Sequence, residues 1–209
     1  MLEIKNFRKA FNDRLILEIP SLHLYQGIHW FKGKNGSGKS TLFNCLAGLS
    51  PYLGEIKLSG HSLTKQPVLY KQRINYSQSE PTFPEFLTGK DLLEYFGQLK
   101  GAKPEQIKEL SDQLSINSYM DQPVGSYSSG MLKKLSIGIA FLGDPLWIIL
   151  DEPLITLDKE AQGIMLNLLV DYNKKGTSFI FATHQDFENQ LIKADHIYEV
   201  KDQKVILVS

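Results

Sequence analysis

Hydrophobic and polar positions divide the chain into strand-forming ends and a helix-forming middle. Residues 2–32 alternate over short stretches, with turn-forming residues at Asn12-Asp13, and this pattern predicts strands joined by turns. From residue 84 to about residue 143, apolar side chains recur at three- and four-residue spacing, which predicts helices. Two shorter strands are predicted between these segments, at residues 54–60 and 74–78.

Three helices are expected in the middle segment. The second covers residues 104–114, and the third follows Ser128-Ser129-Gly130 and runs through Leu142. The first is predicted from apolar positions that share one helix face, which are Leu92, Leu93, Phe96 and Leu99. Because these helices interrupt a strand-rich chain, we expect them to form a separate lobe.

The strand pattern returns after residue 143. Nearly continuous apolar runs at 147–152 and 178–184 predict strands that are buried on both faces, as in a parallel sheet. A helix is predicted between them, over residues 159–174, and a closing hairpin over residues 195–208. This alternation of strands and helices predicts an α/β protein with a mostly parallel sheet.

Length and composition narrow the possible functions. A chain of 209 residues suggests one domain, with a core at 1–83 and 144–209 and a helical lobe at 84–143. The 23 basic residues balance the 23 acidic ones, so nucleic acid is not favoured as an electrostatic partner. The single Cys45 excludes an internal disulfide and suits a reducing compartment. No apolar run approaches the about 20 residues of a membrane-spanning helix.

A glycine-rich stretch joins the predicted strand 28–31 to a helix that starts near Thr41. It fits the pattern of Gly, four residues, then Gly-Lys-Ser, in which backbone amides and a helix N-terminus bind phosphate. Lys39 is expected to reach the β- and γ-phosphates, and Ser40 to hold Mg²⁺. The matching residues are Gly33, Lys34, Asn35, Gly36, Ser37, Gly38, Lys39 and Ser40.

Polar residues also follow two of the predicted buried strands. Because ligands bind beyond the carboxyl ends of parallel strands, Asp151 and Glu152 should meet the phosphate loop. Asp151 would anchor Mg²⁺, directly or through water, and Glu152 would polarise an attacking water. The alternative for such a pair is a solvated helix entry, which the apolar residues before it and Pro153 after it argue against. His184 is expected to contact the γ-phosphate, although a lone histidine is more often structural.

Together these motifs resemble the nucleotide-binding domain of ATP-binding cassette (ABC) proteins, over nearly the whole chain and in the family's order. The phosphate loop corresponds to Walker A, and residues 148–151 correspond to Walker B, followed by the catalytic Glu152. Phe11 matches the aromatic A-loop residue that stacks on the base, although by itself it is equally well an ordinary strand aromatic. Gln78 matches the Q-loop.

The signature separates this family from other P-loop proteins. It reads Tyr127-Ser128-Ser129-Gly130-Met131 here, where Leu-Ser-Gly-Gly-Gln is usual, so a glycine and a glutamine are replaced. A serine before a helix is by itself also a simple N-cap. The resemblance implies that Ser128 and Gly130 bind the γ-phosphate of a nucleotide held by the other subunit. It also identifies Thr156-Leu157-Asp158 as the D-loop and His184 as the switch histidine.

The resemblance implies a P-loop NTPase of the ABC ATPase fold: a mostly parallel core sheet, an N-terminal antiparallel β subdomain and a helical signature lobe. It implies ATP and Mg²⁺ as ligands. The implied catalytic residues are Glu152, His184 and Lys39. The implied metal ligands are Ser40, Gln78 and Asp151. The implied nucleotide contacts are Phe11, Gly33, Asn35, Gly36, Ser37, Gly38, Lys39, Ser40, Thr41, Gln78, Ser128, Gly130 and Asp158.

The same resemblance implies how the chain acts. It would hydrolyse ATP as an ATP-dependent, head-to-tail homodimer on the cytoplasmic face of a membrane, and power separately encoded integral membrane permease subunits. The helical lobe would receive these subunits near Gln78. The chain's compactness and the methionine at position 131 of the signature resemble those of ATPases of small exporters, including antibiotic-resistance and haem-exporter types. The alternatives are a soluble ABC-type ATPase in DNA maintenance or translation, and a nucleotide sensor without turnover, which the intact Glu152 argues against.

Overall fold

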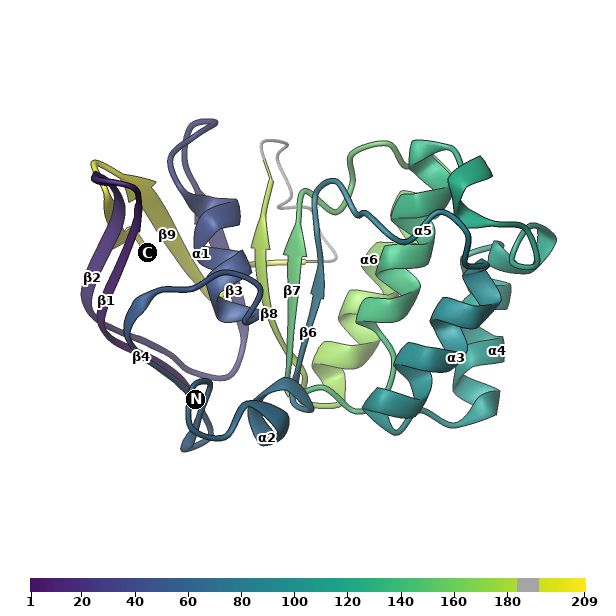
Figure 1. Cartoon of the computed structure of the whole chain (residues 1–209), viewed down its shortest axis with the longest axis horizontal. Helices are drawn as coiled ribbons and strands as arrows, with labels where there is room; N and C mark the ends of the chain where they lie inside the picture. The colour runs from purple at the N-terminus through teal and green to yellow at the C-terminus, as the bar shows by residue number, and fades with distance from the viewer. Residues whose placement is uncertain (184–191) are drawn as a thin grey trace.

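The computed structural model describes residues 1–183 and 192–209, and Figure 1 shows two β-sheets with helices on both sides of the second. The strands are β1 (Leu2–Phe11), β2 (Arg14–Leu24), β3 (Ile28–Lys32), β4 (Leu53–Leu58), β5 (His61–Ser62), β6 (Ile74–Ser77), β7 (Trp147–Asp151), β8 (Ser178–Ala182), β9 (His196–Lys201) and β10 (Lys204–Leu207). The helices are α1 (Lys39–Leu46), α2 (Pro67–Lys71), α3 (Gly89–Lys100), α4 (Pro104–Gln113), α5 (Ser129–Ala140) and α6 (Lys159–Lys174).

The smaller sheet is antiparallel, with the strand order β2-β1-β4-β5. β1 and β2 form a long hairpin in which Phe11 pairs with Arg14 across the predicted turn. Asn12 adopts a φ of 51° there, a left-handed conformation that asparagine tolerates better than most residues. The expected antiparallel β subdomain is therefore confirmed.

The larger sheet has the order β10-β9-β3-β8-β7-β6. Every neighbouring pair from β9 to β6 is parallel, and only β10 runs antiparallel, as the second strand of a hairpin with β9. Its turn is formed by Asp202 and Gln203, as predicted, and both residues have positive φ. The expected mostly parallel core sheet is confirmed.

Side chains of the parallel sheet alternate between two hydrophobic cores. Trp30, Ile148 and Phe181 face a core that contains α3, α4, α5 and α6. Phe31 and Ile149 face a second core that contains α1 and the antiparallel sheet. α1 and α5 therefore cover opposite faces of the same sheet, as Figure 1 shows. The helices of 84–143 share their core with α6, and the division into core and lobe remains a prediction.

Helix boundaries follow local chemistry. Thr88 and Asp91 form a capping box at the start of α3, and Gly101, with a φ of 66°, caps its C-terminus after Lys100. α5 ends at Ala140, before the predicted Leu142, and the side-chain amide of Asn75 donates hydrogen bonds to the carbonyl oxygens of both residues. α2 and β5 were not predicted from the sequence. Within the described ranges, none of the helices is long and apolar enough to cross a membrane.

Candidate active site

The carboxyl ends of three adjacent strands lie level at one edge of the parallel sheet. Trp30 of β3 pairs with Phe181 of β8, which in turn pairs with Leu150 of β7. This register brings the loop after β3 and the acidic pair after Leu150 to the same edge, at the top of Figure 1. His184, which follows β8 in sequence, lies outside the described residues.

The loop after β3 has the backbone that its glycines predict. Gly33, Gly36 and Gly38 have φ of 153°, 76° and 106°, in the region that side chains disfavour. A Cβ on Gly33 would lie 2.6 Å from the carbonyl oxygen of Val200, and one on Gly38 would lie 3.0 Å from the side chain of Leu17. Gly33 therefore excludes larger residues for steric as well as conformational reasons, and Gly38 disfavours them mainly through its φ.

Lys39, the first residue of α1, folds back over this loop. Its ammonium donates to the carbonyl oxygens of Gly33, at 2.7 Å, and Lys34, at 3.2 Å. Burial lowers the pKa of Lys39, and the charges of Glu152 and Asp151 oppose that shift. The ammonium of the phosphate loop therefore lies within electrostatic reach of the acidic pair.

Asp151 is a buried carboxylate beside several donors. Burial raises its pKa, and the Ser40 hydroxyl, the Lys133 and Lys39 ammonium groups and the Tyr76 hydroxyl oppose that rise. Its Oδ1 is buried and accepts no hydrogen bond from the described residues. A hydroxyl and one carboxylate suit Mg²⁺, which keeps waters and phosphate oxygens as its other ligands. Within 1–183 and 192–209, no group of three or more His, Cys, Asp or Glu side chains is arranged so that it could hold a metal ion.

Glu152 follows in an uncommon backbone conformation. Its φ is 46°, and its N–H donates to the carbonyl oxygen of Ala182 at 2.9 Å. The side chain is buried, with 8% of the residue exposed. A non-glycine residue in the left-handed region costs free energy, and such strain is concentrated at functional sites because surrounding contacts hold it there.

Two further predicted nucleotide contacts lie at the margins of the site. Phe11 ends β1 with 53% of the residue exposed, and the Lys9 ammonium lies 4.4 Å from the centre of its ring. The β1–β2 hairpin that carries Phe11 closes on the same upper side as the phosphate loop in Figure 1. Gln78 follows β6, and its amide donates to Asn44 Oδ1 of α1 at 3.4 Å.

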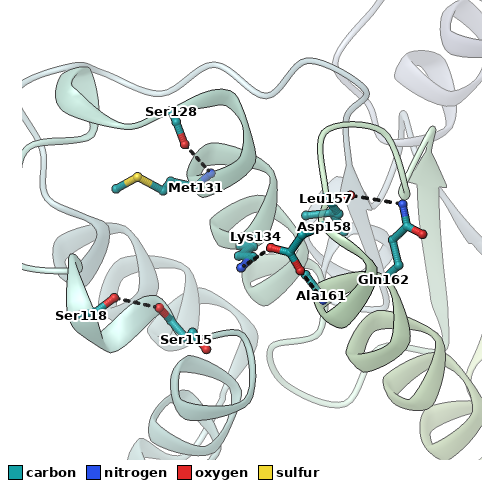
Figure 2. A network of polar contacts seen from close by, with 9 residues as sticks. All are labelled: Ser115, Ser118, Ser128, Met131, Lys134, Leu157, Asp158, Ala161 and Gln162. Carbon is teal, nitrogen blue, oxygen red and sulfur yellow. Dashed lines mark hydrogen bonds and ion pairs between the residues drawn. The ribbon is translucent and has the colours of Figure 1, made fainter.

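Figure 2 shows the residues of the signature and the D-loop. Ser128 caps α5, because its hydroxyl accepts a hydrogen bond from the N–H of Met131 at 3.2 Å. Asp158 caps α6 through the N–H of Ala161 at 2.8 Å and also accepts from the Lys134 ammonium at 3.3 Å. α5, which Ser128 caps, and α1, which begins in the phosphate loop, cover opposite faces of the sheet.

Lys133 is a site residue that the sequence reasoning missed. Its ammonium donates to the carbonyl oxygens of Gln78, at 2.7 Å, and Asp151, at 2.9 Å. Burial lowers its pKa to about 8, and the charges of Asp151 and Glu152 oppose the shift. The helical periodicity could have predicted that Lys133 is buried, since it shares a helix face with Ser136 and Ile137, which are both buried.

Comparisons with known proteins agree with this geometry. Residues 17–155 match the family model described as ABC transporter. The ABC transporter ATP-binding protein NatA of Bacillus subtilis is 32% identical over 83% of this chain and 73% of its own length. The linearmycin resistance ATP-binding protein LnrL of the same organism is 27% identical, over 88% and 61%. These relatives do not favour a soluble ATPase in DNA maintenance or translation.

Two other matches show how much of each protein the similarity covers. The human ATP-binding cassette sub-family A member 2 is 33% identical over 88% of this chain, yet this chain spans only 8% of that protein's length. A solved dimeric structure of a bacterial ABC transporter cassette superposes with a TM-score of 0.85 at 20% identity, over 98% of this chain and 96% of that one. With the family model matching most of the chain, this protein belongs to the ABC transporter family and is an ABC nucleotide-binding domain.

Proposed function

We propose that this chain binds MgATP, hydrolyses it, and thereby powers transport through integral membrane subunits on separate chains. The observation that carries the proposal is the meeting of Lys39, Asp151 and Glu152 at one edge of the sheet. Phosphoryl transfer requires mainly positioning and charge neutralisation, and these residues supply both signs of charge around one loop.

Each residue then has a defined task. The loop amides and the N-terminus of α1 bind the phosphates, and the Lys39 ammonium exchanges its present carbonyl acceptors for phosphate oxygens. Ser40 and Asp151, with Gln78 beside α1, hold Mg²⁺, which would neutralise charge on the phosphates when bound. Glu152 orients and polarises the attacking water. We also propose that His184 contacts the γ-phosphate and that Phe11 stacks on the base.

Two variants test the ATPase directly. Lys39→Ala should abolish tight MgATP binding or turnover, because it removes the loop's cation. Glu152→Gln should keep ATP bound and nearly stop hydrolysis, because an amide of similar shape cannot act as a base. Calorimetric binding and phosphate release, measured on both variants and on wild type, give the answer. Turnover of Glu152→Gln within a few-fold of wild type would show that another residue is the catalytic carboxylate.

We propose that the active form is a head-to-tail homodimer. Within one chain, α5, which Ser128 caps, lies on the opposite face of the sheet from α1, and we propose that a second chain supplies Ser128, Gly130 and Asp158 to each nucleotide. The dimeric cassette structure reported above supports this assembly. A two-fold axis gives isologous surfaces and two equivalent sites.

A groove beside the site supports a membrane partner. It has a volume of about 910 Å³ and lies between α2, α3 and the residues after β6. Apolar side chains that are more than half exposed line it, and they are Leu49, Val68, Tyr95 and Leu99. Exposed apolar surface of this kind marks interaction sites. We propose that a cytoplasmic segment of the permease binds here, next to Gln78, which places the chain at the cytoplasmic face of the membrane.

Purification from detergent-solubilised membranes tests this partner. The Val68→Asp/Tyr95→Lys double variant should lose a co-purifying integral membrane protein and retain its basal ATPase activity. Ile206→Asp on β10 is the matched control, because Ile206 is also exposed and apolar but does not line the groove. Equal recovery of the membrane protein with all three proteins would argue against the groove.

We further propose that transport runs outward and that the cargo is a small compound. The similarity to the linearmycin resistance protein LnrL supports this direction.

A further inference from the structure

Lys133 is a buried cation in the middle of the ATPase machinery. It lies on α5 with only 1% of the residue exposed. Its ammonium donates to three backbone carbonyl oxygens, those of Gln78 at 2.7 Å, Ser79 at 3.4 Å and Asp151 at 2.9 Å. An ammonium has three N–H donors, so these carbonyls account for all of them. The three acceptors belong to the segment after β6 and to the end of β7.

The contact with Asp151 fixes one particular peptide unit. The carbonyl of Asp151 accepts from Lys133, and the N–H of the same peptide, on Glu152, donates to Ala182. Both polar groups of the peptide between the two acidic residues are therefore held. This peptide precedes the φ of 46° at Glu152, a conformation that persists only where neighbouring contacts enforce it.

The other two contacts connect this peptide to the Q-loop. Gln78 and Ser79 follow β6, and Gln78 also lines the groove between α2 and α3. One ammonium thus holds the backbone of the groove-lining segment and the backbone of the catalytic carboxylates. A displacement of the groove-lining segment would therefore move the Lys133 ammonium. Movement of the ammonium would in turn shift the backbone of Asp151.

We propose that Lys133 is a positioning residue for hydrolysis: it fixes the Asp151–Glu152 peptide and ties it to the segment at Gln78. The proposal rests on the proposed function, since it takes Glu152 as the catalytic carboxylate. Lys133 acts through Glu152 and does not touch the nucleotide. Its loss should therefore lower the rate of hydrolysis and leave ATP affinity unchanged. A displacement of about 1 Å at a catalytic group can cost about a hundredfold in rate.

The same helix provides a matched control. Ser136 of α5 and Ser77 of β6 form a buried hydroxyl–hydroxyl hydrogen bond of 2.9 Å, one turn away from Lys133. Ser136→Ala removes a buried polar contact between α5 and β6 and does not alter the contacts of the Asp151–Glu152 peptide. A purely structural role for Lys133 predicts similar effects of the two changes on turnover.

The test compares wild type, Lys133→Met and Ser136→Ala in three measurements: kcat and KM for MgATP, calorimetric ATP affinity, and urea unfolding. We expect kcat of Lys133→Met to fall about tenfold to a hundredfold, with KM and Kd within about threefold of wild type. Ser136→Ala should lose stability and keep kcat within about twofold. In single-turnover experiments, Lys133→Met should add little to the defect of Glu152→Gln, because both act through one residue.

Other outcomes would overturn the proposal. If Lys133→Met folds and has the kcat of wild type, or loses no more kcat than Ser136→Ala does, Lys133 is not a positioning residue. That result would leave the proposed ATPase function intact. If Lys133→Met does not fold, Lys133→Gln decides, since its amide is one atom shorter and cannot reach all three carbonyls. A wild-type kcat in that variant is then the contradicting result. Wild-type protein without ATPase activity would instead remove the proposed function, and this inference with it.

Discussion

Phe11 is presented to solvent with one face of its ring already occupied. The Lys9 ammonium lies 4.4 Å from the ring centre and is itself held by the carbonyl of Pro51 at 2.8 Å. The ring thus contacts a cation while about half of the residue, 53%, stays exposed to a ligand. This arrangement is what a base-stacking residue requires, and it could not be read from the position of one aromatic in a strand.

Phe11→Ala should weaken ATP binding without slowing chemistry at saturating nucleotide. Stacking of a base on an aromatic ring is worth about 1–3 kcal/mol in single-strand binding proteins, and we expect a loss on that scale. GTP should be partly accepted, because stacking reads no base edge. Titration calorimetry measures the loss, with Phe11→Tyr as the control that keeps the ring. Wild-type affinity in Phe11→Ala would refute the stacking role.

His29 is a buried histidine far from the phosphate loop, at the other end of β3. Its Nε2 lies 2.8 Å from the carbonyl oxygen of Tyr25, so the neutral ring carries its proton there, and the ring stacks on Trp147 and His196. Burial lowers its pKa to about 4; the Tyr25 carbonyl and Asp195 oppose this shift, and His196 adds to it. The unfolded chain has the ordinary value of 6.5 and therefore binds more protons between these two pH values.

Stability should consequently fall as the pH drops from about 6.5 to about 4, by up to about 3 kcal/mol from His29 alone. His29→Phe keeps an aromatic ring in the stack and removes the titration. Urea unfolding of both proteins at several pH values isolates this contribution as the difference between two pH profiles. Parallel profiles between pH 6.5 and pH 4 would contradict the assignment to His29.

At the scale of elements, the sequence predicted what is encoded locally. The phosphate loop, the α6 helix and the turn at Asp202-Gln203 are each specified by a few adjacent residues, and the structure has all three. α2 is too short, at five residues, to show a helical period. The left-handed φ of Glu152 and the carbonyl acceptors of Lys133 depend on residues distant in sequence, so no local pattern revealed either of them.

The capping box of α3 offers a prediction for this scale. The Thr88 hydroxyl accepts from the N–H of Asp91, and the Asp91 carboxylate accepts from the N–H of Thr88. Thr88→Ala should lower the free energy of unfolding by about 1 kcal/mol, because an N–H at the helix start loses its acceptor. Thr88→Ser keeps the hydroxyl and is the control. Urea unfolding measures both, and ATP affinity should not change, since α3 lies outside the nucleotide site.

At the scale of the whole molecule, the parallel sheet lies between two helices whose N-termini are both proposed to bind ATP phosphates. α1, which begins in the phosphate loop, lies on one face, and α5, which Ser128 caps, lies on the other. ATP should therefore close two chains into a dimer, and hydrolysis should release them by removing the γ-phosphate that bridges them, as in other γ-phosphate switches.

Light scattering of Glu152→Gln with ATP tests the assembly, because that variant should trap the closed dimer. Ser128→Arg in the same background should block closure through its bulk and still bind ATP at its own Lys39. The Glu152→Gln protein without nucleotide is the control and should be monomeric. A monomer at tens of micromolar protein, with nucleotide bound, would count against a homodimer of the isolated chain.

The place of β3 between β8 and β9 also has a consequence for synthesis on the ribosome. β1, β2 and β4 pair with one another and are complete by residue 58, so the antiparallel sheet can form early. β3 leaves the ribosome soon after β2, but its two neighbours begin only at residues 178 and 196. Until they emerge, both edges of β3 are unpaired, and such edges expose a nascent chain to aggregation and to chaperones. The nucleotide site is therefore assembled last, when the C-terminal strands enclose the first strand of the parallel sheet.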